Sequence, residues 1–205
     1  FTKFLQKGLL MKHFLITLIT LTFVYGSSLK AEEKLSFGVD AGWGFADLNA
    51  DDTAQYLANL SGQTITYTED SGAIMFRLFG EYEIDKTHSV QLGYFFSGDM
   101  SATYSSASAS ATEDYSVNGL DLIYMYTFDD FSFKVGVHDS EVDGEASLTL
   151  GGTTYAAGSS TTGGGAIVGF DYNIDKQSYV GFQQYSNVGG DDDSDVIYLS
   201  YGYIF

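Results

Sequence analysis

The last ten residues of the chain carry the clearest alternation of apolar and polar positions. Along 196–205, the residues of one parity are apolar or aromatic, namely Ile197, Leu199, Tyr201, Tyr203 and Phe205. Ser200 and Gly202 fall on the other parity. Alternate side chains of an extended chain point to opposite sides, so this stretch predicts a strand with one continuous apolar face. Such a strand would aggregate in water, whereas a closed barrel in lipid needs an apolar outer face and has no free edge. We therefore expect a strand that closes a membrane barrel.

The same alternation recurs along the preceding chain. Further strands are predicted at 35–45, 73–84, 90–96, 120–128, 131–137, 168–174 and 180–183. In the first of them, Phe37 and Trp43 lie on one face and Gly38 and Gly42 on the other. The second face is too small and polar for a soluble core, so we expect apolar side chains to face lipid and small ones to line a crowded lumen. The pattern predicts an all-β fold, a transmembrane up-and-down antiparallel β-barrel of eight strands.

Long and short connections alternate between these strands. The long ones are rich in Ser, Thr, Gly and Asp and are predicted to be exposed loops at 49–71, 99–114, 139–163 and 187–195. The short ones are predicted turns at 85–88, 129–130 and 175–177. An even number of strands places both termini on one side, which is the periplasm in outer-membrane barrels, with the long loops outside.

The N-terminal region reads as a targeting segment. The apolar run 14–25 follows Met11, Lys12 and His13 and is too short for a spanning helix, so a cleavable signal peptide is expected at 11–31. Residues 1–10 precede Met11 and are interpreted as non-native or upstream sequence. Residues 32–205 are then expected to form one barrel domain, without the peptidoglycan-binding domain that would tether a barrel to the wall.

Composition excludes several classes of site. The chain has no Cys, which excludes disulfides and thiolate metal sites, and no Pro, which suits strands in hydrogen-bonded ladders. Tyr and Phe number 16 each, as aromatic girdles at two membrane interfaces require. The formal net charge of −18 argues against a nucleic-acid partner. We expect no cofactor and no metal site. The carboxylates of the acidic run 191–195 could collect Ca²⁺, but the run lacks the spaced ligands of an EF-hand loop and indicates a solvated loop tip.

The chain resembles the OmpA-type and OmpX-type eight-stranded outer-membrane barrels, a porin-like family. The resemblance rests on the glycine-rich first strand with Trp43, the alternating loop lengths and the terminal strand. It implies a monomer in the outer membrane of a Gram-negative bacterium, in contact with lipid and lipopolysaccharide. It also implies recognition by the barrel-assembly machinery of a terminal signal, here Leu199, Tyr201, Tyr203 and Phe205. Members of this group have unrelated activities, so the resemblance implies no single one.

Charged residues at inward positions form the first candidate site. These are Arg77, Glu81, Asp121, Lys134 and Asp171, with Asp40 as a further member. Buried charges need partners, and we expect Lys134 to pair with Asp171 and Arg77 to pair with Asp121 or Glu81. A network of satisfied pairs that plugs the lumen is favoured over a gated polar path.

One further pattern resembles an enzyme. His138 and Ser140 share a strand face, and lipid A deacylases, which are also eight-stranded, use a His-x-Ser arrangement. The leading prediction is nevertheless a non-enzymatic outer-membrane protein whose long acidic loops have a structural or surface-interaction role. A lipid A-modifying hydrolase using His138 and Ser140 is one alternative, and a narrow passive channel is the other.

Overall fold

The computed structural model describes residues 34–191 and 194–205. Its elements, in chain order, are β1 (Leu35–Ala46), α2 (Ala50–Ser61), β2 (Thr66–Asp70), β3 (Gly72–Glu83), β4 (His88–Ser97), β5 (Met100–Ser105), β6 (Ala109–Phe128), β7 (Phe131–Leu150), β8 (Thr153–Asn173), β9 (Ser178–Tyr185), the short 3₁₀ helix η1 (Val188–Gly190) and β10 (Val196–Ile204). The signal peptide expected at 11–31, the upstream segment 1–10 and residues 192–193 of the acidic run lie outside the described residues.

Eight strands close into a ring in which every pairing is antiparallel. The order around it is β1, β3, β4, β6, β7, β8, β9 and β10, and β10 returns to pair with β1. At this seam Ala41 lies opposite Tyr201 and Trp43 opposite Leu199. The prediction of an eight-stranded up-and-down barrel closed by the terminal strand is confirmed.

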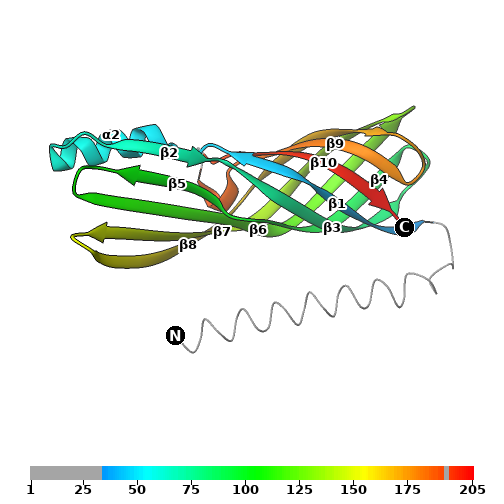
Figure 1. The fold of residues 1–205 in the computed structure, drawn as a ribbon. Helices are drawn as coiled ribbons and strands as arrows, with labels where there is room; N and C mark the ends of the chain where they lie inside the picture. Colours follow the sequence, from blue (N-terminus) through cyan, green and yellow to red (C-terminus); the bar gives the residue numbers. More distant parts are fainter. Residues whose placement is uncertain (1–33, 192–193) are drawn as a thin grey trace.

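The ring continues on one side into a long extension (Figure 1). We call this part the distal extension: α2, β2, β5, residues 109–118 of β6, residues 139–150 of β7 and residues 153–165 of β8. β2 pairs with β5, β5 with the upper part of β6, and β6, β7 and β8 pair along their whole length. The C-terminus lies at the opposite end of the barrel, with the short turns.

The prediction that 49–71, 99–114 and 139–163 are loops is wrong. These segments form α2 and β2, β5 with the start of β6, and the β7–β8 ribbon. Their Ser, Thr, Gly and Ala residues carry no apolar alternation. A ladder of hydrogen bonds nevertheless forms between their backbone groups, because β6, β7 and β8 continue without a break from the barrel. Gly151 and Gly152, both at positive φ, make the two-residue turn at the tip of the ribbon.

Local signals explain the helix within this extension. α2 carries Asp51 and Asp52 in its first turn, where acidic side chains offset the positive end of the helix dipole. It ends at Ser61, and the following Gly62 adopts a left-handed conformation and donates its N–H to the carbonyl of Ala58. Ala50 and Ala54 of the helix pack against Ala102 and Tyr104 of β5. No helix among the described residues is long and apolar enough to cross a membrane.

The side-chain faces of the ring are inverted relative to a soluble protein. Large apolar side chains cover its outer surface and are exposed, among them Leu122, Phe133, Val135, Val137, Val168, Phe170, Val180 and Leu199. Charged and amide side chains lie at the centre and are buried, among them Asp40, Arg77, Gln91, Asp121, Lys134, Asp171 and Gln183. The strand parities expected from the sequence therefore hold around the ring.

Candidate functional site

The guanidinium group of Arg77 is the hub of the lumen. On β3, Arg77 is completely buried and donates from Nε and Nη2 to the two carboxylate oxygens of Asp121, each at 2.7 Å. Its Nη1 donates to Asp40 at 3.3 Å and to Gln91 Oε1 at 2.9 Å. Arg77 thus joins β1, β3, β4 and β6 through one planar group, and a bidentate Arg–carboxylate pair fixes its orientation.

Neutral polar groups complete this network. Gln91 passes the contact on by donating from Nε2 to Glu81 at 2.9 Å. Tyr179 donates its hydroxyl hydrogen to Asp40, and Tyr185 donates to Gln183 at 3.1 Å and lies 3.4 Å from Asp121. The network therefore reaches from β1 round to β9, and Glu81 is connected to Arg77 only through Gln91.

A second ion pair lies nearer the turn end of the barrel. Lys134 Nζ of β7 lies 2.6 Å from Asp171 Oδ2 of β8, and both side chains are buried. The ammonium group also lies 5.1 Å from the centre of the Tyr179 ring, a distance at which cation–π attraction contributes. Tyr179 thus touches both ion-pair systems.

The charged residues of the lumen are predictable from the sequence, but the neutral tyrosines that bond to them are not. The structure brings Arg77 to Asp121 and Lys134 to Asp171, two of the contacts expected from parity. It also brings Asp40, the further member of the predicted set, to Arg77. The sequence does not single out Tyr179 and Tyr185, because an aromatic side chain in such a barrel is expected on the outer surface. Their parity, opposite to that of Val180 and Phe182, was the signal that could have placed them inside.

His138 and Ser140 do not contact each other. His138 Nε2 lies 2.8 Å from the carbonyl of Ser186, which can only accept, so Nε2 carries the hydrogen. Ser140 Oγ donates to the carbonyl of Gly163 at 3.3 Å and accepts from the N–H of Gly189 at 3.0 Å. Both side chains are buried and hold the segment around η1 against the mouth of the barrel. This geometry contains no nucleophile–base pair.

A vestibule opens at the turn end of the barrel. It has a volume of about 440 Å³ and reaches inward to Glu81, Ser132 and Asp171. At its rim the turns begin with Asp85 and Asp175, whose carboxylates accept backbone N–H groups of Thr87 and His88, and of Gln177 and Ser178. These hydrogen bonds lower the pKa of both rim carboxyl groups. The two turns are built alike, as the repeated Ile-Asp-Lys sequence suggests.

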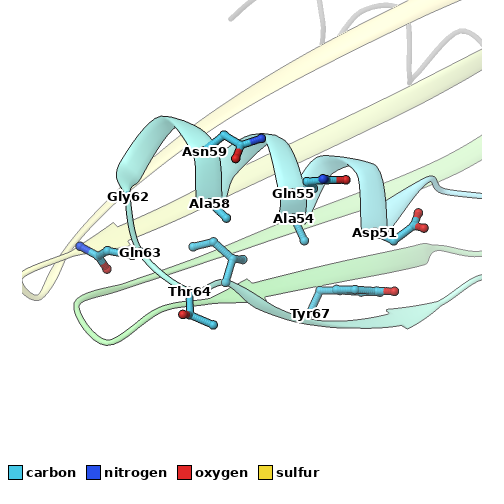
Figure 2. Close-up of a pocket in the computed structure, with 10 residues that line it drawn as sticks. Asp51, Ala54, Gln55, Ala58, Asn59, Gly62, Gln63, Thr64 and Tyr67 are labelled. Atoms are coloured by element: carbon cyan, nitrogen blue, oxygen red, sulfur yellow. The ribbon is translucent and has the colours of Figure 1, made fainter.

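The distal extension contains a second, wider hollow (Figure 2). It has a volume of about 660 Å³ and lies between one flank of α2 and the segment 62–67 that leads into β2. Asp51, Gln55 and Asn59 line it from the helix, and Tyr67 lines it from the strand. Sequence reasoning missed this hollow because it treated the whole segment as a loop.

The barrel and the distal extension differ in their content of basic residues. In residues 35–205 the only Lys and Arg residues are Arg77, Lys86, Lys134 and Lys176. All four lie in the barrel or in its short turns, so the distal extension contains acidic residues and no Lys or Arg. Within it Glu113 accepts hydrogen bonds from Tyr104 and Tyr115, and burial together with this carboxylate raises the pKa of Tyr115.

Comparison with known proteins identifies the fold. No family model and no curated protein matches the chain. Among solved structures, Ail of Yersinia pestis in complex with the heparin analogue sucrose octasulfate matches with a TM-score of 0.50 and 14% identity, over 84% of this chain and 99% of that one. A second Ail structure gives 0.49 and 15% identity, over 85% and 100%, and Neisserial surface protein A gives 0.42 and 18%, over 84% and 98%. The resemblance found in the sequence is confirmed at the level of fold: this chain has the fold of the OmpA-type and OmpX-type eight-stranded outer-membrane β-barrels.

Proposed function

We propose that this chain is an integral outer-membrane protein that presents its distal extension at the cell surface for interaction with a partner, on a barrel whose lumen is plugged. One observation carries the proposal: the ring exposes apolar side chains on its outside and buries ion pairs inside. An apolar outer surface of this extent is stable only in contact with lipid. The barrel then serves as an anchor, and the extension is the part available to other molecules.

The plugged lumen follows from the network around Arg77 and Lys134. Water or solute could pass only if these side chains moved, and moving one partner of a buried pair leaves the other charge without compensation. The test is conductance in planar bilayers. We expect no steady single-channel conductance from the purified protein. A stable open conductance level would contradict the plugged lumen and support the alternative of a narrow passive channel.

We also propose an orientation for the protein in the outer membrane. Both termini and the short turns face the periplasm, and the distal extension projects beyond lipopolysaccharide on the outside. The chain inserts as a monomer through the barrel-assembly machinery, which reads Leu199, Tyr201, Tyr203 and Phe205. In intact cells, an added protease should cleave an epitope inserted between Gly151 and Gly152 and spare one placed in the 85–88 turn. Cleavage at the 85–88 turn alone would reverse the orientation.

The charge of the extension limits the kind of partner. The Ail structure contains a sulfated sugar, a polyanion. A polyanion needs Lys or Arg, and the distal extension of this chain has neither. The partner we propose is therefore not of that class.

A further inference from the structure

We propose that the hollow between α2 and the segment 62–67 binds a neutral sugar, such as the end unit of an oligosaccharide. The inference rests on the proposed surface role of the distal extension and names the chemical class of its partner. The volume of the hollow, about 660 Å³, falls within the roughly 300–1,000 Å³ of small-molecule sites.

One wall of the hollow is a polar flank of α2. Asp51, Gln55 and Asn59 follow one another at intervals of four residues, so their side chains lie along one line of the helix surface. The helix packs on β5 through a different flank, which carries Ala50 and Ala54. The polar flank therefore takes no part in that packing and is available to a ligand.

The opposite wall carries an exposed aromatic ring. Tyr67 of β2 lies opposite Tyr104 of β5 in the antiparallel ladder, so both side chains project from the same face of the sheet. α2 covers Tyr104 on that face, whereas Tyr67 is 44% exposed. Ala54 and Ala58 point from the helix toward the segment that carries Tyr67 (Figure 2). The aromatic ring thus lies at the hollow and remains accessible.

The amide side chains of the hollow have unused hydrogen-bonding groups. Gln55 and Asn59 are exposed, and neither side chain forms a hydrogen bond within the described part of the chain. Gln63 accepts from Ser108 Oγ at 3.4 Å through Oε1, and its NH₂ group can donate to a ligand. Each free amide offers donors and an acceptor in one plane, and neighbouring sugar hydroxyls need both. These side chains can therefore hydrogen-bond a sugar.

Tyr67 supplies the apolar contact that a sugar also needs. A hexose carries C–H groups on the faces of its ring, and the negative face of an aromatic ring attracts such weakly positive hydrogens. Ala58 and Ile65 line the same hollow and add apolar surface. A purely apolar ligand would cover the amides without giving them partners, which costs free energy. The combination of aromatic ring and amides therefore suits a sugar better.

The charge of the hollow favours a neutral sugar. Among the described residues that line it, Asp51 alone is charged, and its Oδ1 already accepts from the N–H of Asp52. The distal extension has no Lys or Arg that could compensate a sulfate or carboxylate group. An anionic sugar would meet repulsion from Asp51, whereas a neutral hydroxyl can donate to its free oxygen.

Saturation-transfer NMR on the folded protein in lipid nanodiscs tests the proposal with three neutral disaccharides, lactose, cellobiose and maltose. We expect saturable binding of at least one of them with a Kd of about 1 mM, and transfer concentrated on the C–H protons of one ring face. Empty nanodiscs control for contact with lipid. No transfer to any of the three sugars would overturn the proposal. Equal or tighter binding of a sulfated form of the bound sugar would overturn its neutral class.

Substitutions of tyrosine locate the ring contact. Tyr67→Ala should weaken sugar binding about tenfold because the stacking surface is lost, and Tyr67→Phe, which keeps the ring, should leave the Kd within about twofold. Tyr56 is another exposed tyrosine of the extension but does not line the hollow, so Tyr56→Ala is the matched control and should bind like the parent. Equal binding by Tyr67→Ala and the parent would place the sugar elsewhere and overturn the assignment.

Two substitutions on α2 test the other wall. Gln55→Met keeps the length of the side chain and removes its hydrogen-bonding groups, so we expect binding to weaken about fivefold, the cost of about one net hydrogen bond. Asp51→Asn removes the charge and keeps an acceptor, so the Kd should stay within about twofold. A loss as large as that of Tyr67→Ala would show that the charge of Asp51 dominates and would contradict a neutral ligand.

Two competitors distinguish the sources of such a sugar. One is polysaccharide released from the cell's own lipopolysaccharide, and the other is desialylated glycan released from mucin. Displacement of the bound disaccharide by the first would identify a ligand on the same cell, and displacement by the second an external one. Either result supports the sugar site.

Failure of this inference is separable from failure of the proposed function. The nanodisc measurement does not depend on which way the protein faces in a cell. The protease experiment on intact cells does not depend on any sugar. Absence of sugar binding with surface-exposed 151–152 would leave the surface role standing with another partner chemistry.

Discussion

The barrel and the distal extension are parts of one sheet, yet different interactions hold them. In the barrel, the strands are joined by side chains that meet at the centre, above all Arg77 with Asp40 and Asp121. In the β7–β8 ribbon, Ser, Thr, Ala and Gly face each other and the ladder of backbone hydrogen bonds dominates. The barrel is therefore specified by particular residues, whereas the ribbon is specified by its continuity with the barrel strands.

We expect the largest loss of stability from replacing Arg77, at the centre of the lumen network. Arg77→Ala leaves the buried carboxylates of Asp40 and Asp121 without their cation, and we expect the free energy of unfolding to fall by about 3–5 kcal/mol. Urea unfolding in detergent, followed by the shift between folded and unfolded gel mobility, measures this. The triple variant Arg77→Met, Asp40→Asn, Asp121→Asn should recover much of the loss. No recovery would mean that Arg77 acts through packing and not through charge.

A matched pair of glycines tests the contrast between the two regions directly. A Cβ atom on Gly42 would lie 1.9 Å from the carbonyl oxygen of Leu199 at the β1–β10 seam, whereas one on Gly158 would meet its nearest atom at 3.6 Å. We expect Gly42→Val to destabilise the barrel by about 1–3 kcal/mol and Gly158→Val to change its stability little. The same gel assay applies. Equal effects of the two variants would remove the distinction between a specified barrel and a tolerant ribbon.

Shortening the β7–β8 ribbon tests whether the barrel folds without most of the distal extension. Gly144 lies opposite Ser159, so replacing 145–158 with Asn-Gly makes a two-residue turn in the existing register. We expect barrel stability to stay within about 1 kcal/mol of the parent, since loops and ladder ends add little to a closed ring. A barrel that no longer folds would show that the ribbon helps assembly.

The smallest expected effect is at the short turns. Backbone N–H groups lower the pKa of Asp85 and Asp175 from the ordinary value of 3.8. A carboxyl group with a lowered folded-state pKa stabilises the fold above its unfolded pKa, and this contribution is lost as the pH falls through the folded-state value. The double variant Asp85→Asn, Asp175→Asn should therefore be less stable than the parent at pH 7 and nearly equal to it at pH 2. An equal difference at both pH values would exclude the charge as the cause.

The barrel is more predictable from the sequence than the distal extension. The eight barrel strands and the inward positions of Arg77, Asp121, Lys134 and Asp171 are predictable because lipid outside and a narrow lumen inside impose a period of two. The ribbon and β5 were missed because Ser, Thr and Gly give no such signal. α2 is not predicted, although its acidic first turn and its Gly62 cap are present in the sequence, because the surrounding polar residues indicate a loop. Gln184 occupies an outward position of β9, where the alternation leads one to expect an apolar side chain, and its side-chain amide donates to Asp195 at 2.8 Å.

The upper part of β8 places the tip of the ribbon far from the ring. β8 has 21 residues, and its upper part, 153–165, spans about 40 Å beyond the ring at the rise of an antiparallel strand. With the proposed orientation, the tip at Gly151 and Gly152 stands well above the membrane plane. An approaching surface would touch this tip before it met the barrel rim, so in the proposed orientation the ribbon sets the distance between the membrane and a surface partner.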